Sequence, residues 1–345
     1  MKKGNSIHAI AKDLGVSATT ISFIVNGKGK ENRISNEVIK RVEQYLQQIN
    51  YRPNIIAQSL RTGKTYLIGM LVEDISDVFF SSIARGVEMG FENSAYRILF
   101  MSTKNNDANT SFILDLLKEH NVDAFIIAPS LGTEAEIQEV VQSGKPVVLY
   151  DRYFKGLNTC NVMVDNRGGA YMGTMELFNN GFKNVAFVTL KSEQVQMTER
   201  LLGYKDALLH GQQSRAMVLE LSYDLKVEQS SLQIKNFLKK NENIEAIFFA
   251  TNYLTVAGLY ALKDLNLGIS KDRGVVSFDD HAHFGLFNPS ITAVAQPVTE
   301  IAKAIVQNIK EALDAQRICD PRTVVLPPQL IRRRSSQKSV VSMSK

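Results

Sequence analysis

The chain has 345 residues, 44% of them hydrophobic and 22% charged, which is ordinary for a globular protein of two or three domains. Two cysteines are too few for a disulfide framework or a four-ligand zinc site, and they favour a reduced compartment. The sequence lacks the apolar run of a signal peptide and the roughly 20 apolar residues of a membrane span, so we expect a cytoplasmic protein without a membrane partner.

The net charge of +5 is concentrated at the N-terminus. Residues 1–64 contain eleven Lys or Arg and four Asp or Glu, a charge of +7, so the other 281 residues carry −2. A solvated surface would also fit a positive segment. Its position beside a nearly neutral body favours a polyanion-binding head on a separate domain.

The first fifty residues predict three short helices. Gly15 permits the positive φ of a sharp turn after the first helix, and Ser17 is placed to cap the second. Asn26-Gly27 ends that helix, and Ser35 is placed to cap the third. The apolar residues that recur at helical spacing are Ile7, Ile10, Ala11, Leu14, Ile21, Ile24, Val25, Val38, Val42, Leu46 and Ile49. Together these features predict a helix-turn-helix.

The segment from Ser6 to Ser22, SIHAIAKDLGVSATTIS, closely resembles the head of the lactose/galactose repressor family. The resemblance continues through Tyr51-Arg52-Pro53-Asn54 and through Lys64-Thr65 to Gly69, where the family's ligand-binding core begins. A helix pair with a glycine turn occurs in many bundles, but the whole phrase is far more specific. The resemblance implies a sequence-specific DNA-binding transcriptional regulator, a repressor controlled by a small effector.

The resemblance also divides the chain. It implies a helix-turn-helix domain at 1–52, a hinge helix and linker at 53–64, an effector-binding and dimerisation core at 65–335 and a polar tail at 336–345. Two heads on a homodimer would read a pseudopalindromic double-stranded DNA operator, because one head makes too few base contacts for useful specificity.

The early exposed positions of a recognition helix reach base edges in the major groove. Here these are Ala18, Thr19 and Phe23; the methyl groups suit thymine, and the Thr19 hydroxyl suits either base type. Many family members have an arginine where this chain has Phe23, which either reads bases or turns into the core. The residues expected to hold phosphates are Ser6, Ser17, Thr20, Ser22 and Asn26.

The hinge begins after Pro53, which stops the third helix. The seven residues from Asn54 to Leu60 are fewer than the ~12–15 at which an isolated helix is marginal, so we expect them to fold only with DNA and a partner hinge. In the family, a leucine at the Leu60 position enters the minor groove and unstacks a base step. The alternative is an ordinary linker residue. The expected DNA contacts of the hinge are Asn54, Ala57 and Leu60.

From Tyr66 onward, β-rich segments alternate with helical ones. Strands are expected at 67–72, 98–102, 124–128, 147–150, 185–189, 218–221, 246–250 and 275–278. Helices are expected near 80–94, 110–120, 134–143, 167–180, 198–210, 229–240, 254–265 and 298–314. Strict alternation predicts parallel sheets covered by helices on both faces, and the segment from Cys160 to Asp165 starts a second series.

We therefore expect an α/β core of two doubly wound lobes, similar to the periplasmic sugar-binding proteins that the family resembles. The first lobe comprises about 65–163 and 297–325, and the second about 164–296 and 326–335. Parallel sheets bind ligands at the carboxyl ends of their strands, so the cleft between the lobes is the natural site.

Seven positions match the family's effector contacts: Phe79, Phe80, Asp151, Arg200, Asn252, Asp279 and Gln296. Carboxylates beside a guanidinium and an aromatic face suit a polyhydroxylated ligand, so the resemblance implies a sugar or sugar derivative. Either Phe79 or Phe80 can instead belong to the core. Tyr253 replaces an aspartate common in the family, which argues against transferring any particular ligand.

Two rival classes are less well supported. An enzyme on this scaffold would need a catalytic constellation, and the sequence has no Walker A, G-x-S-x-G or HExxH motif. His281-x-His283 after Asp279-Asp280 suggests a metal cluster only weakly, because it lies where the family has a variable loop, so we expect no metal or cofactor. A sugar-binding receptor without DNA function shares the core fold but has no use for a +7 head.

Overall fold

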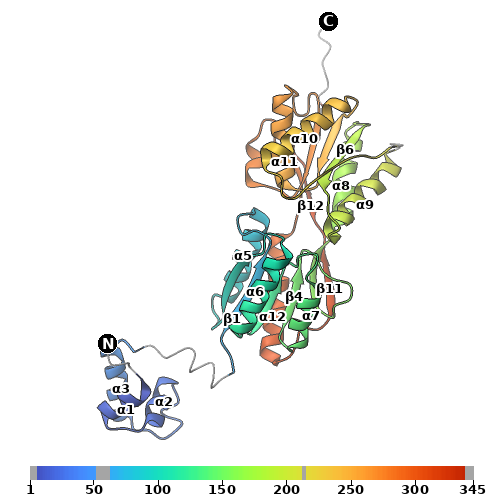
Figure 1. The fold of residues 1–345 in the computed structure, drawn as a ribbon. Coiled ribbons are helices and arrows are strands. Elements are labelled where there is room, and N and C mark those ends of the chain that lie inside the picture. The colour runs from blue at the N-terminus through green and yellow to red at the C-terminus, as the bar shows by residue number, and fades with distance from the viewer. Residues whose placement is uncertain (1–5, 52–62, 212–214, 339–345) are drawn as a thin grey trace. The chain divides into compact units, whose positions relative to one another are not determined.

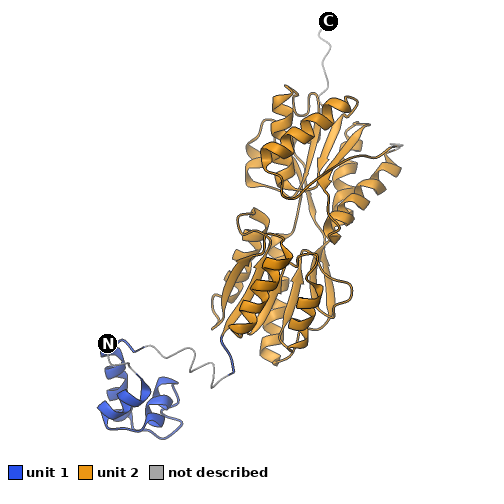
Figure 2. Ribbon diagram, viewed as in Figure 1, with its two compact units in different colours: residues 1–65 blue, residues 66–345 orange. Residues whose placement is uncertain are grey.

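The computed structural model describes residues 6–51, 63–211 and 215–338. It forms two compact units, residues 1–65 and residues 66–345 (Figure 2). The hinge residues Asn54, Ala57 and Leu60, which the sequence assigns to DNA contact, lie outside the described residues.

The first unit contains three helices, α1 (Ile7–Leu14), α2 (Ala18–Val25) and α3 (Asn36–Gln48). Each begins at a serine whose hydroxyl accepts a hydrogen bond from the first turn; the caps are Ser6, Ser17 and Ser35. Gly15 ends α1 with a φ of 62°, which brings α2 sharply back against α1. Ile10, Ile21 and Val42, one from each helix, form the buried centre, so the predicted helix-turn-helix is confirmed.

The second unit contains two lobes, each built on a six-stranded sheet (Figure 1). The first sheet has the order β11-β5-β4-β3-β1-β2, and every neighbouring pair is parallel. Its strands are β1 (Leu67–Val72), β2 (Arg97–Ser102), β3 (Ala124–Ile127), β4 (Val147–Tyr150), β5 (Cys160–Val164) and β11 (Arg322–Leu326). The helices α5 (Val78–Phe91) and α12 (Val298–Ala315) enclose one apolar cluster with this sheet, and α6 (Asp107–Glu119) and α7 (Glu134–Gln142) enclose another.

The second lobe repeats this plan. Its sheet has the order β12-β10-β9-β8-β6-β7. The strands are β6 (Val185–Leu190), β7 (Met217–Leu221), β8 (Ala246–Phe249), β9 (Gly274–Phe278), β10 (Thr292–Ala295) and β12 (Gln329–Ile331). The covering helices are α8 (Asn166–Asn179), α9 (Val195–His210), α10 (Val227–Lys240) and α11 (Asn252–Asp264), and two short 3-10 helices are η1 (Ala282–Leu286) and η2 (Arg334–Ser336). The predicted pair of doubly wound lobes is confirmed.

The chain passes between the lobes three times, after β5, after β10 and after β11. Three details of the sequence-based prediction were wrong. The segment from Cys160 does not start the second series, because β5 pairs with β4 and β11 in the first sheet. The second sheet is not wholly parallel, since β12 runs antiparallel to β10. The polar tail begins later than residue 336, because Ser335 and Ser336 are fully buried and bond to the second lobe.

Candidate nucleic-acid interface and effector cleft

The helix α2 presents the residues expected to read DNA. Ser17 caps it by accepting from the Thr20 N–H at 3.0 Å, and its hydroxyl lies 2.8 Å from the Thr20 hydroxyl. Thr19 is exposed, whereas Ala18 packs partly against the core of the head. Phe23 is half-buried and is not among the side chains packed on that core. The described head therefore favours Phe23 at the helix surface rather than inside.

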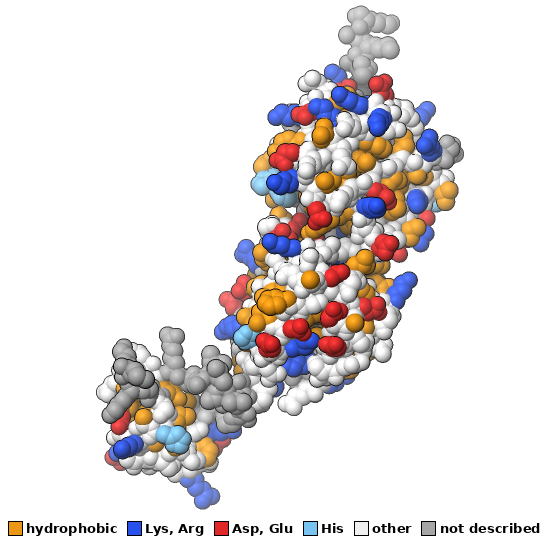
Figure 3. Space-filling view, viewed as in Figure 1, with side chains coloured by type: hydrophobic (Ala, Val, Ile, Leu, Met, Phe, Trp, Pro, Cys, Tyr) orange, Lys and Arg blue, Asp and Glu red, His pale blue; other side chains and the backbone are white. Residues whose placement is uncertain are grey.

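The polar residues expected to hold phosphates have local roles as well. Ser6 caps α1 by accepting from the Ala9 N–H at 3.2 Å. The Asn26 side chain donates to the Ser22 carbonyl at 2.5 Å, which holds the end of α2. The basic side chains Lys12, Lys28, Lys30, Arg33, Lys40 and Arg41 are exposed. Figure 3 shows basic side chains on the visible face of the head, as a polyanion-binding surface requires.

A narrow cavity of about 50 Å³, the interlobe cavity, lies between residues of the two lobes. Six of the seven side chains matched to effector contacts line it: Phe79, Phe80, Asp151, Arg200, Asp279 and Gln296. Asn252 does not line it; its neighbours Thr251 and Tyr253 do. Of the two aromatic residues, Phe80 belongs to the apolar core of the first lobe, and Phe79 packs on that core more exposed.

The two aspartates occupy equivalent places. Asp151 follows β4 and Asp279 follows β9, and these strands hold the same position in their two sheets. Both residues have positive φ, 65° and 69°, a conformation that aspartate tolerates better than most residues. The backbone turn directs each carboxylate from the carboxyl end of its sheet into the interlobe cavity.

Arg200 is held entirely by the second lobe and is only 2% exposed. Its guanidinium donates to Asn166 at 2.9 Å and to the Ala250 carbonyl at 2.6 Å, and it lies 3.6 Å from the centroid of the Phe278 ring. Asp279 lies 3.7 Å from the guanidinium and accepts from the Gln296 amide at 2.6 Å. This arrangement orients a forked donor and two polar groups toward the cavity.

Gly203, one turn along α9 from Arg200, explains how the helix reaches this position. A Cβ on Gly203 would lie 2.1 Å from the Arg167 carbonyl oxygen of α8. Only glycine permits so close an approach of two helix backbones. The Arg200 side chain is therefore carried to Asn166 by a tight α8–α9 contact.

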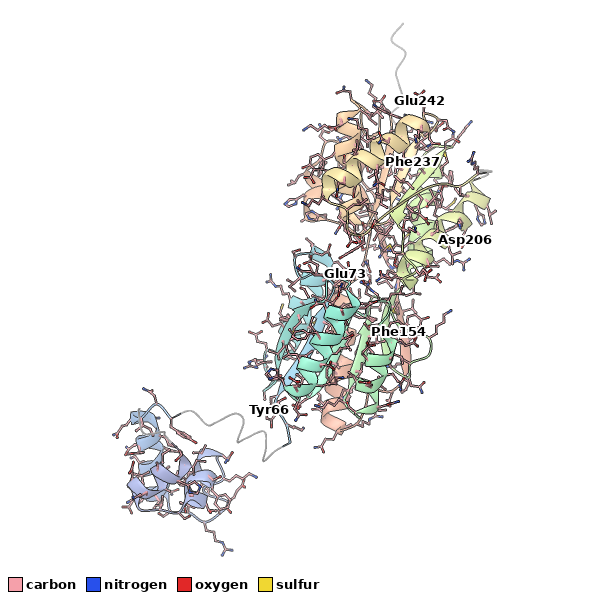
Figure 4. All side chains as sticks on the ribbon, viewed as in Figure 1. Tyr66, Glu73, Phe154, Asp206, Phe237 and Glu242 are labelled. Atoms are coloured by element: carbon pink, nitrogen blue, oxygen red, sulfur yellow. The ribbon has the colours of Figure 1, made fainter. Side chains whose placement is uncertain are left out.

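Sequence reasoning missed a buried charge cluster centred on Arg152, which is 5% exposed. Its guanidinium contacts Glu73, lies 3.0 Å from Asp151 and donates to Asn105 at 3.1 Å. The Gln194 amide, from the second lobe, also donates to Asn105, at 2.7 Å. Figure 4 shows Glu73 at the end of the first lobe that faces the second. One signal was present, since Arg152 adjoins a matched acid directly after a buried strand.

Tyr223 of the second lobe lies beside Glu73, and burial, together with that carboxylate, raises the Tyr223 pKa. The Arg152 cluster thus bridges the lobes through two contacts, Glu73 with Tyr223 and Asn105 with Gln194. These contacts hold the lobes together across the interlobe cavity. Its free volume is well below the ~300 Å³ at which ligand sites usually begin, so a sugar-sized ligand requires these side chains to rearrange.

The rings of His281 and His283 lie 4.7 Å apart, but the described residues hold no group of three or more His, Cys, Asp or Glu suited to a metal ion. No helix in the described ranges has both the length and the apolar character needed to cross a bilayer.

Comparison with known proteins agrees with both halves of the architecture. Residues 6–54 match the family described as bacterial regulatory proteins, lacI family, and residues 174–336 match a periplasmic binding protein-like domain. In the solved lac repressor dimer bound to operator, the matched chain shares the fold with a TM-score of 0.83 and 20% identity, over 97% of this chain and 100% of that one.

Curated relatives match over nearly the whole chain. The HTH-type transcriptional regulator PtxS of Pseudomonas plecoglossicida is 30% identical over 337 residues, which cover 96% of this chain and 95% of that protein. The ribose operon repressor of Haemophilus influenzae is 26% identical over 333 residues, 94% of this chain and 97% of that protein. Both are transcription regulators by name. The chain therefore belongs to the LacI family of bacterial transcriptional regulators.

Proposed function

We propose that this regulator is a cytoplasmic homodimeric repressor that binds a pseudopalindromic operator through its heads and a small carbohydrate between its lobes. Binding, not catalysis, is its chemistry. One observation carries the proposal: six side chains matched to effector contacts, from positions 79 to 296, converge on the interlobe cavity. A relative named for the ribose operon supports carbohydrate as the effector class.

On DNA, Thr19 and Phe23 read base edges from the surface of α2, and Ala18 contributes a methyl contact. Ser6, Ser17, Thr20, Ser22 and Asn26 hold phosphates that set the register of the head. In the hinge, Asn54, Ala57 and Leu60 enter the minor groove, as their resemblance to the family implies.

Coupling between effector and operator requires two lobe arrangements. An effector shifts their balance only by binding one arrangement more tightly than the other. The contact of Asn105 with Gln194, which crosses the cavity, differs between the arrangements in this proposal. The first lobe adjoins the hinge in sequence, so its movement alters the spacing of the two hinges in the dimer.

The DNA half is tested by selecting bound fragments from the source genome and measuring affinity by fluorescence anisotropy. Each phosphate neutralised contributes a slope of about −0.9 to the plot of log K against log salt concentration. For the full-length protein we expect a negative slope of several units, because the two heads neutralise several phosphates. Binding that does not change with salt would contradict a DNA-contacting head.

The hinge is tested by Leu60→Ala. A side chain that opens a base step contributes only on the operator, where the duplex is bent. We expect weaker operator binding and unchanged binding to random DNA. An equal loss on both would mean that Leu60 is an ordinary linker residue.

The effector half is tested by Arg200→Lys, which keeps the charge but loses the fork that donates to Asn166 and Ala250. We expect operator affinity to stay and the effector response to disappear. The matched control is Arg167→Lys on the surface of α8, where the guanidinium pairs with Asp206. A response that survives in Arg200→Lys, as in the control, would place the effector elsewhere.

A further inference from the structure

The interlobe cavity has an excess of negative charge. Among the described residues that line it are four carboxylates, Glu73, Asp77, Asp151 and Asp279, and two guanidiniums, Arg152 and Arg200, with no lysine or histidine. If every group is ionised, the lining carries two net negative charges. An anionic ligand placed there would be repelled, and a cationic one attracted.

Both guanidiniums are already engaged by protein acceptors. Arg152 contacts Glu73, Asp151 and Asn105. Arg200 is bound by Asn166, by the Ala250 carbonyl and by Asp279. Each guanidinium is therefore paired with at least one carboxylate of the protein, which weakens its attraction for a carboxylate or phosphate on a ligand. Among the described residues, the cavity also contains an acceptor that has no protein donor.

A chain of side-chain amides ends in such an acceptor. Arginine only donates, so Arg152 requires Asn105 to present its oxygen. Gln194 therefore donates its NH₂ group to that oxygen at 2.7 Å and presents its own oxygen, which accepts from Gln196 at 3.2 Å. The chain leaves the Gln196 Oε1 atom as its last acceptor. That atom is buried without a hydrogen-bond partner in the described structure, and Gln196 is 4% exposed.

Asp77 is the second group that lacks a complement. Its carboxylate caps α5 by accepting from the Phe79 N–H at 2.8 Å, and no Lys or Arg of the described residues forms an ion pair with it. Burial and the negative charge of Asp279 raise the Asp77 pKa to about 6. A water molecule could donate to Gln196, but it would not neutralise Asp77. The two groups together call for a ligand that donates hydrogen bonds and carries positive charge.

We propose that the effector is a carbohydrate that carries an amino group and no acidic group, with its ammonium beside Asp77 and a donor on Gln196 Oε1. This inference rests on the proposed function, because it assumes that the interlobe cavity is the effector site. It narrows the effector class: sugar acids and sugar phosphates are excluded, and an amino sugar is preferred over its parent sugar.

The test is calorimetric titration of the full-length protein with matched hexoses. The probes are D-glucosamine, D-glucose, D-gluconate and D-glucose 6-phosphate, with D-galactosamine and D-galactose as a second ring. We expect one amino sugar to bind about tenfold or more tightly than its parent, since a charge-assisted hydrogen bond is added. The acids should bind more weakly than the parent. Tighter binding of an acid, equal binding of amino sugar and parent, or no binding by any probe would each overturn the inference.

Two variants separate the contributions of Asp77 and Gln196 to ligand binding. Asp77→Asn keeps the cap of α5, because asparagine caps as well as aspartate, and it should abolish the preference for the amine without weakening D-glucose. Gln196→Met should weaken both sugars. The control is Asp107→Asn, an exposed acid in the first turn of α6 that does not line the cavity, and it should change neither. A preference for the amine that persists in Asp77→Asn would overturn the inference.

A pH series gives an independent readout. An ammonium binds the ionised form of Asp77, so amino sugar affinity should rise as pH passes from about 5 to 7 and Asp77 deprotonates, while the sugar amine stays largely protonated. D-glucose affinity should stay level. The opposite trend would contradict the placement beside Asp77. Failure of the proposed function would be distinguishable, because it would abolish operator binding, which anisotropy measures without any sugar.

Discussion

Replacing Arg152 with methionine removes the guanidinium that Glu73 and Asp151 share, and leaves both carboxylates in a site that is largely closed to water. Arg152 and Asp151 are only 5% and 8% exposed, so solvent screens the pair weakly. Removing one partner of a buried ion pair costs about 3–5 kcal/mol, because the remaining charge is uncompensated. At roughly 2 °C per kcal/mol for a unit of this size, the core of Arg152→Met should melt about 5–10 °C lower at neutral pH.

The pH dependence identifies the cause. Burial raises the pKa of Asp151 even beside Arg152, and removal of the guanidinium raises this pKa further above its unfolded value. The penalty is then complete above the raised pKa of Asp151 and is lost as pH falls through it. The difference in Tm between parent and variant should therefore shrink between about pH 7.5 and pH 4.5, as followed by circular dichroism.

Two further variants complete the experiment. Adding Glu73→Gln and Asp151→Asn to Arg152→Met removes both orphaned charges and should restore most of the lost stability. Arg167→Met breaks an exposed ion pair with Asp206, where the expected effect is at most about 1 kcal/mol. The reasoning is refuted if Arg152→Met melts with the parent, or if its deficit is the same at both ends of the pH range.

Three smaller predictions test the packing and the head. Gly203→Ala should destabilise the core by roughly 1–3 kcal/mol and weaken the effector response, because α8 and α9 must separate. The control in thermal melts is Gly285→Ala, whose added Cβ would meet no atom within 4 Å. Equal melting temperatures of the two variants would contradict the tight contact. Ser17→Ala should lower the stability of the head by about 1 kcal/mol, which is measured as faster hydrogen exchange of the α2 amides. Ser17→Asn should retain the cap, so identical exchange rates in the two variants would argue against capping. Phe23→Ala should change operator preference in a fragment selection while lowering the stability of the head by less than about 1 kcal/mol. A loss of stability near ~3–5 kcal/mol, as for a core phenylalanine, would place Phe23 in the core of the head.

The strands that could be predicted from the sequence are those that appear in it as apolar runs. The buried strands β1, β3, β4, β6, β8 and β9 were all found from such runs, because central strands of parallel sheets are covered on both faces. No residue of the edge strands β11 and β12 is fully buried, and Val325 of β11 is 58% exposed, so neither strand appears as a buried apolar run. Sheet membership of β5 was also beyond the pattern, since pairing with β11 joins residues about 160 positions apart.

The candidate site was predictable only where a residue type matched a known position. Arg200, Asp151 and Asp279 were named in this way and do line one cavity. Arg152 and Gln196 were not, because their importance depends on partners that the fold brings from other segments: Glu73 and Asn105 for the first, and Gln194, itself held by Asn105, for the second. The spacing of residues along the chain does not indicate such contacts.

The three passages of the chain between the lobes also govern the order of synthesis. The helix α12 contributes Ile301, Ile305 and Ile309 to the apolar core of the first lobe, and β11 adds its outer strand only at residues 322–326. A chain emerging from the ribosome completes its head within the first 65 of its 345 residues, yet its first lobe must wait for β11 at residues 322–326. Nascent chains that stop early would carry a finished head on an open apolar sheet, a species that chaperones bind and proteases remove. Incomplete copies would leave uncovered the apolar face of the first sheet that α12 covers in the full chain.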